Sequence, residues 1–301
     1  MKKFIALFIF CLSVVDILAC INPDTKVLKN GILVYRDDFQ LEHEVMVPVG
    51  HRFRNINNRL IRSLDSLYHA TKDIDYLSDK GYVLILQGKY EEAIKLYLAI
   101  ERIHPHRYST ASNVGTAYEL AGKPKNALQW IKKAVSIDST SHNYSEWLHV
   151  KILEAKIKGE EAITPDFLIN TNFGDEPIPV TTLSRDALSD LLNQIHVQLQ
   201  ERLSFVKPKD KIVAQLLFEL GNLNYLLDDK KSGLAIFKKA EVYGYDNFLI
   251  KQRMDVSEGK KPRTKPAEPT TVNLSWVFWT GGILVVALVF FFWMESKAKR
   301  I

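Results

Sequence analysis

The stretch KGYVLILQGKYEEAIKLYLAIERIHP, residues 80–105, places small residues at fixed intervals among large apolar ones. The small residues are Gly81, Gly88 and Ala93. The same pattern returns 34 residues later, as glycine at positions 115 and 122 and alanine at position 127. A period of about 34 residues is typical of repeats that each contain two helices. The pattern therefore indicates an architectural need for small residues, not a chemical one.

Close packing of two antiparallel helices explains these positions. We expect Gly81 on the first helix to face Ala93 on the second, and Gly115 to face Ala127, because bulk at either position would push the helices apart. Gly88 allows the tight turn between the two helices. The small residues thus predict helix hairpins that follow one another along the chain.

The second copy, VGTAYELAGKPKNALQWIKKAVSIDS (114–139), closely resembles the tetratricopeptide repeat, while the first copy has Lys80 where that family usually has leucine. A weaker copy, LLFELGNLNYLLDDKKSGLAIFKKAEVYG (216–244), has Asp228 in place of the turn glycine and Asn224 in place of the tyrosine. The repeats are predicted near 74–107, 108–141 and 214–247. The resemblance implies an all-α solenoid of antiparallel helix pairs over residues 57–255.

Apolar residues at helical spacing predict further helices at 57–73, 143–159 and 187–203. The first of these is expected to cap the solenoid, whose terminal repeats would otherwise expose apolar surface. In the N-terminal region, 21–56, the Asn30-Gly31 pair between apolar runs predicts a short β-hairpin at 26–35. Residues 164–184 contain three prolines and are predicted to form a long loop between repeat blocks.

The first twenty residues, MKKFIALFIFCLSVVDILAC, have two lysines before an apolar run and are typical of an export signal. The end of this segment, Ile17 to Cys20, resembles the lipoprotein cleavage motif, so Cys20 is a candidate lipidation site. Leu18 and Asp16 are unusual in that motif. Lipidation, ordinary cleavage and an uncleaved anchor therefore stay open as alternatives. Because Cys11 and Cys20 both lie in this segment, the exported domain has no internal disulfide.

Residues 274–294 contain no charged side chain, and their length matches a hydrocarbon core about 30 Å thick, which predicts a single transmembrane helix. The Lys-, Pro- and Thr-rich residues 256–273 are predicted to be a spacer. Basic residues flank the span on both sides, so the export signal decides the orientation. It places the repeat domain outside the cytoplasm and the tail, 295–301, inside it. We expect a bacterial inner-membrane protein of the cell envelope with a single span.

Catalytic and metal-binding patterns do not stand out from background. His104-Pro105-His106 is a candidate ligand pair for a metal, but solvated turn residues explain it better. We expect no metal, no cofactor and no enzymatic activity. The chain has a net charge of +5, and the predicted export separates it from nucleic acid, so we expect no nucleic-acid partner.

The resemblance places groove residues at the fifth, ninth and twelfth positions of each repeat. It thereby implies a partner-binding groove lined by Ser78, Tyr82, Ser112, Thr116, Glu119, Asn222 and Tyr225. Ile85 and Phe218 occupy the same positions, but packing in the core explains them equally well. The lysine and asparagine set that binds peptide carboxylates in one chaperone-binding subgroup is absent, so binding of chaperone tails is not supported.

The leading hypothesis is a membrane-anchored, extracytoplasmic scaffold that binds an envelope protein or peptide through the groove or the 164–184 loop. The first alternative is an envelope enzyme with a site in 21–56 and 164–184. The second is a structural subunit of a membrane complex, assembled through the small face at Gly281-Gly282. The partner, the oligomeric state and the biological process cannot be read from the sequence.

Overall fold

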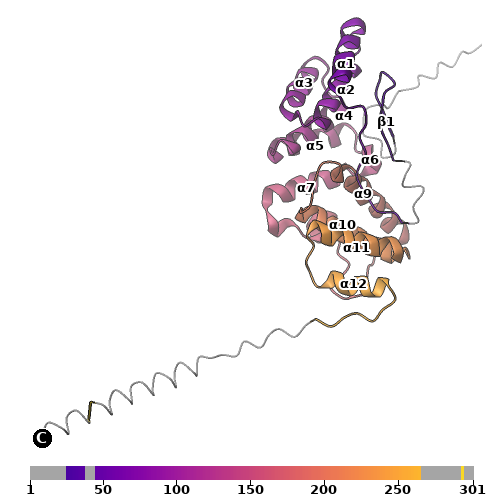
Figure 1. The fold of residues 1–301 in the computed structure, drawn as a ribbon, viewed down its shortest axis with the longest axis vertical. Helices are drawn as coiled ribbons and strands as arrows, with labels where there is room; N and C mark the ends of the chain where they lie inside the picture. The colour runs from indigo at the N-terminus through magenta and orange to yellow at the C-terminus, as the bar shows by residue number, and fades with distance from the viewer. Residues whose placement is uncertain (1–24, 38–44, 266–292, 295–301) are drawn as a thin grey trace, which may run out of the picture. The chain divides into compact units, whose positions relative to one another are not determined.

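A computed structural model describes residues 25–37, 45–265 and 293–294. In residues 25–263, which form one compact unit as far as they are described, helices follow one another from α1 to α12 (Figure 1). The helices are α1 (Asn58–Thr71), α2 (Ile74–Leu86), α3 (Tyr90–Ile103), α4 (Tyr108–Leu120), α5 (Pro124–Ile137), α6 (Ser141–Tyr144), α7 (Glu146–Lys158), α8 (Pro165–Ile169), α9 (Arg185–Leu203), α10 (Lys211–Leu226), α11 (Lys230–Tyr243) and α12 (Leu249–Ser257).

The predicted repeats form helix hairpins. Helices α2 and α3, α4 and α5, and α10 and α11 pack against each other in pairs, and short turns connect them. Gly88 and Gly122 lie in two of these turns, at φ of 75° and 74°, where a residue with a side chain would be strained. The structure thus confirms the helix-pair architecture predicted from the period of the small residues.

The packing partner of the first-helix glycine differs from the prediction in the first two repeats. A Cβ on Gly81 would lie 2.6 Å from the Tyr97 ring, and a Cβ on Gly115 would lie 2.5 Å from Ile131. The nearest atoms thus belong to a large residue one turn beyond the expected alanine. The glycine makes room for a large side chain that fills the space between the two helices.

The third repeat shows the expected contact between two small residues. A Cβ on Gly233 would lie 3.1 Å from the carbonyl oxygen of Gly221, and one on Gly221 would lie 2.4 Å from Phe237. Asp228, which replaces the turn glycine, adopts a left-handed φ of 73°. Short polar residues such as aspartate tolerate that conformation better than most others.

A two-stranded antiparallel sheet precedes the helices, as the Asn30-Gly31 pair predicts. Strand β1 (Thr25–Val27) pairs with β2 (Leu33–Arg36), and Gly31 has a φ of 81° in the turn. The hairpin is not separate from the helices, since Val34 and Tyr35 pack with Leu60 and Leu64 of α1 in one apolar cluster. The hairpin and α1 together cover the edge of the first repeat.

Two connecting segments differ from the prediction. The loop predicted over 164–184 begins with helix α8, because the Thr164 side chain accepts a hydrogen bond from the Phe167 amide and Pro165 suits the first helical position. The helix predicted from residue 143 begins at Glu146. Before it, His142, Asn143 and Tyr144 adopt left-handed φ values of 52°, 53° and 59°.

The predicted export signal, 1–20, lies outside the described residues, as does the predicted transmembrane helix, 274–294, except for Trp293 and Met294. Residues 266–273 of the predicted spacer, 256–273, and the whole predicted tail, 295–301, also lie outside the described residues. Among the helices in the described parts of the chain, none combines the length and apolarity needed to cross a membrane.

Candidate interaction surfaces

Most of the residues predicted to line a groove are covered by other parts of the same chain. Ser78, Tyr82, Ser112 and Asn222 are each at most 8% exposed, and Ile85 and Phe218 belong to the apolar core. Thr116 and Tyr225 are half-buried, and the side chain of Glu119 is 7% exposed. The three repeats therefore do not present these residues as one open groove within the described structure. Partner binding by them stays a prediction.

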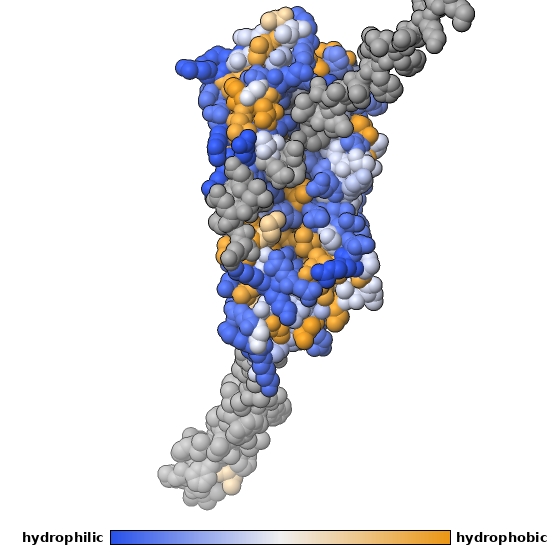
Figure 2. Space-filling model, turned by 90° about the vertical axis from the view of Figure 1, so that its right-hand side faces the viewer, coloured by the Kyte–Doolittle hydropathy of each residue, from blue (hydrophilic) through white to orange (hydrophobic). Residues whose placement is uncertain are grey.

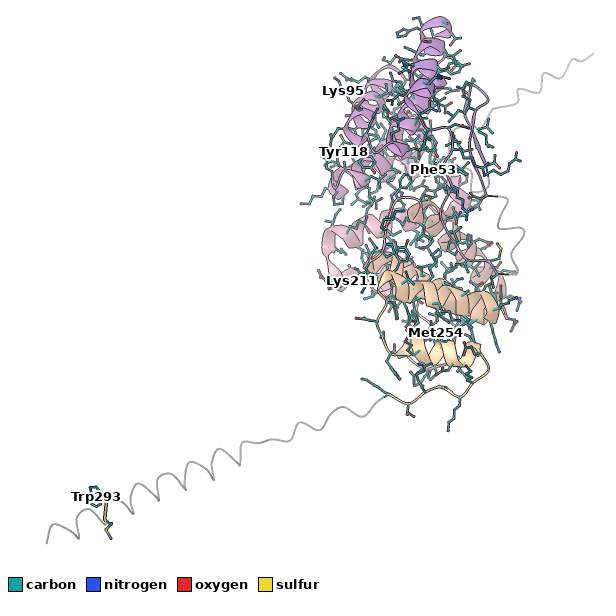
Figure 3. The ribbon with its side chains drawn as sticks, in the orientation of Figure 1. Phe53, Lys95, Tyr118, Lys211, Met254 and Trp293 are labelled. Carbon is teal, nitrogen blue, oxygen red and sulfur yellow. The ribbon has the colours of Figure 1, made fainter. Side chains whose placement is uncertain are left out.

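The N-terminal hairpin covers the groove position of the first repeat. Tyr82 packs in the same cluster as Leu28, Val34 and Tyr35 of the hairpin region. The ammonium group of Lys26 lies 5.6 Å from the centre of the Tyr82 ring, a distance at which a cation and an aromatic face attract each other. Phe53, labelled beside the hairpin in Figure 3, packs against the same cluster, and its ring lies 5.7 Å from that of Phe205.

The end of α9 covers the groove position of the second repeat. Arg202 donates hydrogen bonds from both guanidinium NH2 groups to Glu119, at 2.7 and 3.3 Å. The same carboxylate also contacts His149 Nε2 at 2.7 Å and Lys156 Nζ at 2.6 Å. Burial raises the pKa of Glu119, but these three groups outweigh it and hold that pKa well below its usual range. Glu119 is therefore a buried, charged hub between α4, α7 and α9.

A second carboxylate continues this network. Glu146 contacts His142 Nδ1 at 2.5 Å and accepts a hydrogen bond from the Tyr108 hydroxyl at 2.5 Å, and His142 Nε2 lies 3.2 Å from Glu201. Burial lowers the pKa of His142, but Glu201 and Glu146 outweigh burial and raise it to about 9. At neutral pH His142 is therefore protonated. Its positive charge attracts Glu146 of α7 and Glu201 of α9, and so links the left-handed turn at 142–144 to both helices.

The third repeat has a separate buried carboxylate. Glu219 accepts hydrogen bonds from Asn222 at 2.9 Å and from Gln215 at 2.6 Å. Burial raises its pKa to about 7, and Asn222, Arg253 and Gln215 counteract that effect only in part. The side-chain amide of Asn222, which was predicted to line the groove, thus donates its hydrogen bond to a residue inside the chain. Tyr225 is half-buried, and Lys230 Nζ lies 5.1 Å from the centre of its ring.

The charged network around Glu119 encloses little space. The cavity beside it has a volume of about 60 Å³, whereas ligand pockets usually measure about 300–1,000 Å³. In the parts of the chain that the structure describes, no group of three His, Cys, Asp or Glu side chains is arranged to hold a metal ion. His104 and His106 are exposed on their turn. The network therefore links α4, α7 and α9 inside the protein and leaves too little space for a typical ligand.

Part of the predicted 164–184 loop is held by hydrogen bonds and exposes apolar side chains. Arg253 of α12 is only 1% exposed, and its guanidinium donates hydrogen bonds to the carbonyl oxygens of Phe173, Gly174 and Glu176. On the outside of this loop, Ile178 and Val180 are 55% and 59% exposed. The loop is already ordered in the folded chain, so a partner could bind these two side chains without first ordering the loop.

A second feature is an extended segment, residues 45–57, which we call the arm. It has no regular secondary structure and runs from α11 to the start of α1. Side chains of the helical domain bind its backbone: Gln200 accepts hydrogen bonds from the Val49 and Gly50 amides, at 2.9 and 3.2 Å. The amide of His51 donates to the Ser204 hydroxyl at 2.8 Å.

Figure 2 faces the side that carries the hairpin and shows apolar residues there as separate patches among hydrophilic ones.

Comparison with known proteins gives no family and no relative. No family model matches the chain, and no curated protein matches its sequence. Among solved structures, the chain is similar to MamA, with 17% identity, coverage of 60% of this chain and 83% of that chain, and a TM-score of 0.26. It is also similar to a tetratricopeptide repeat protein from Parabacteroides merdae ATCC 43184, with 15% identity, coverage of 66% and 78%, and a TM-score of 0.32.

A third similar structure is the TPR2AB domain of yeast Sti1 in a complex with pHSP90, with 17% identity, coverage of 66% and 75%, and a TM-score of 0.30. Identities and TM-scores of this size do not support an argument about family or function. The description of this chain as a series of helix hairpins rests on its own helix pairs and on the packing at Gly81, Gly115 and Gly221.

Sequence reasoning identified Glu119 but missed the groups that bind it. Arg202 and His149 lie on helices that were predicted, yet their spacing on those helices gives no indication of a shared carboxylate. The arm was also missed, because residues 45–57 have neither helical nor strand periodicity. The Pro48-Val49-Gly50 sequence was the available signal, since a glycine after an apolar stretch often marks a close approach of two backbones.

Proposed function

We propose that this chain is a non-catalytic protein-interaction scaffold, anchored in a bacterial cell membrane with its repeat domain outside the cytoplasm. The location rests on the export signal and the transmembrane segment predicted from sequence. The observation that supports the interaction role is the anchored loop, in which Arg253 fixes three carbonyl groups while Ile178 and Val180 stay exposed. Contiguous exposed apolar surface marks protein-interaction sites, and we assign that role to these two neighbouring side chains.

The partner that suits this loop is an envelope protein with an apolar surface. A partner that covered Ile178 and Val180 would remove apolar area from water without having to order the loop, which lowers the entropic cost of association. The two alternatives, an envelope enzyme and a subunit of a membrane complex, make no use of these side chains. An enzyme would need catalytic side chains that converge in one pocket, and a subunit would assemble through its membrane segment.

The test is in-cell crosslinking of the full-length chain carrying a C-terminal tag, with captured proteins identified by mass spectrometry. We expect the variant Ile178→Asp/Val180→Asp to lose one envelope protein that the wild type captures. Val242→Asp is the matched control, because Val242 is also apolar and 61% exposed but lies on α11. Equal capture by the wild type and both variants would exclude the loop as the binding surface.

The location is tested in the same cells. Protease added to spheroplasts should degrade the repeat domain and leave the C-terminal tag protected. Degradation of the tag with the repeat domain intact would reverse the proposed orientation.

A further inference from the structure

The arm is held in a way that recognises backbone more than side chains. Four of its amides, those of Met46, Val49, Gly50 and His51, donate to side-chain oxygens of the helical domain. The acceptors belong to Ser232 on α11, Gln200 on α9 and Ser204 just after α9. Lys239 on α11 donates to the carbonyl oxygen of Pro48. We call Gln200, Leu203, Ser204, Ser232 and Lys239 the arm channel.

Shape adds one requirement to this backbone recognition. Gly50 is buried against the end of α9, and a Cβ at this position would lie 2.7 Å from the carbonyl carbon of Leu203. Its φ of +84° is also one that residues with side chains rarely adopt. The segment in the channel therefore needs a glycine at this point.

The arm fills the channel only in part. Met46 and Val49 are 50% and 43% exposed, while Val47 is half-buried and Pro48, Gly50 and His51 are buried. A hollow of about 370 Å³ lies beside Met46, lined by Leu192, Val197, Leu227 and several amide side chains. Each hydrogen bond from a neutral group contributes little net stability, because it replaces a hydrogen bond to water. A segment with larger side chains at the exposed positions would gain contacts that the arm lacks.

We propose that the arm channel is a peptide-binding site occupied in cis, and that its partner in trans is an extended segment of another polypeptide with the apolar-Pro-apolar-Gly chemistry of residues 47–50. The proposal rests on the scaffold function but uses a surface separate from the Ile178 and Val180 loop. The arm then competes with the partner. Because it is tethered, its effective concentration is on the order of millimolar or higher, and it keeps the site closed until it is weakened.

The test uses the full-length chain and a fluorescent synthetic peptide, VMVPVGHRFR, with the sequence of residues 45–54, and measures binding by anisotropy. We expect Gly50→Leu to displace the chain's own arm and to bind the peptide at least ~10-fold more tightly than the wild type, a difference of about 1.4 kcal/mol. Val49→Leu is the matched control: it changes an exposed arm residue and should bind no better than the wild type. A peptide with leucine in place of glycine should not bind any of these chains.

Three further measurements separate displacement of the arm from loss of folding, which circular dichroism would reveal. Val47→Asp weakens the arm without changing the channel and should also gain peptide binding. In the wild type, excess peptide should speed hydrogen exchange of the arm amides at 49–51. Adding Gln200→Leu to the Gly50→Leu chain should abolish binding. Folded open-arm variants that bind no peptide, or bind both peptides equally, would overturn the proposal, as would unchanged exchange in the wild type.

Failure here is distinguishable from failure of the scaffold function. If the peptide does not bind but the loop variant still loses its captured protein, only the arm channel is excluded. If the peptide binds and the loop variant captures normally, the chain is a scaffold that works through the channel.

Discussion

Glu119 of α4 and Arg202 of α9 form a buried ion pair, 2.7 Å between oxygen and nitrogen, although 83 residues separate them in the sequence. Each side chain is less than 10% exposed. Three positive or protonatable groups surround the carboxylate, so the pair joins two helices that belong to different parts of the solenoid. Glu119 was predicted to face a partner, and the structure gives it an internal partner.

Removal of the arginine should destabilise the fold. Arg202→Met leaves the Glu119 charge buried with only His149 and Lys156, and we expect a loss of about 3 kcal/mol in the free energy of unfolding, which urea denaturation would measure. Arg185→Met is the control, since the Arg185 and Asp228 side chains are 69% and 80% exposed and form a surface pair. That pair should contribute at most about 1 kcal/mol. Similar losses for both variants would contradict the role given to the buried pair.

The charge of His142 should make stability depend on pH. Its pKa is about 9 in the folded chain and about 6.5 when unfolded. A raised pKa means that the protonated group stabilises the fold fully below pH ~6.5, and that this stabilisation is lost as the pH rises through ~9. It amounts to at most about 3 kcal/mol. The thermal midpoint of unfolding should therefore decrease as the pH rises from ~7 to ~10.

The variant His142→Asn isolates this effect, because asparagine tolerates the left-handed backbone but cannot carry the charge. We expect it to be less stable than the wild type near pH 7 and to lose less stability between the two pH values. Parallel curves for the two chains would assign the pH dependence to other groups.

Low pH should also weaken this network, because it protonates the carboxylates of Glu119 and Glu146. Burial raises the pKa of Glu119 and Glu146, but their basic partners lower both values below the ordinary range for glutamate. A lowered pKa means that the stabilisation is present above the unfolded value, about 4.3, and is lost as the pH falls through the folded one. We expect Glu119→Gln to flatten the acid limb of the stability curve. An acid limb identical to the wild type would exclude Glu119 as a contributor.

The helix pairs should not tolerate a methyl group at the first-helix glycine. Gly221→Ala would place a Cβ 2.4 Å from the Phe237 ring, and we expect overpacking to cost about 1–3 kcal/mol in urea denaturation. Phe237→Leu in the same chain should recover part of this loss, because the smaller side chain leaves room for the methyl group. Additive losses in the double variant would show that the two residues do not compete for the same space.

The loop with Ile178 and Val180 should depend on one buried side chain. Arg253→Lys keeps the charge but loses the planar group that reaches the carbonyl oxygens of residues 173, 174 and 176. Hydrogen exchange of residues 174–180 should become faster while that of α4 and α5 stays unchanged. Gln252→Ala, a change at the neighbouring α12 position, is the control. Unchanged exchange in Arg253→Lys would mean that other contacts hold the loop.

The sequence by itself determined the local architecture of this protein. The period of small residues predicts the helix pairs, and the Asn30-Gly31 pair predicts the hairpin, because both signals reside in residues that are neighbours along the chain. The glycine partners were predicted less well: the period shows where small residues recur, but not which large side chain, such as Tyr97, fills the space they leave.

Only the tertiary structure decided which surfaces are covered. Gln200 meets Gly50 across 150 residues, and Arg253 meets Phe173 across 80. A hydrogen bond between distant residues has no period and no local composition, since its partners are set by how whole helices pack. For the same reason, the resemblance could assign groove positions such as Tyr82, and the sequence could predict the hairpin and the helix at 187–203, but not that these two elements cover the groove positions.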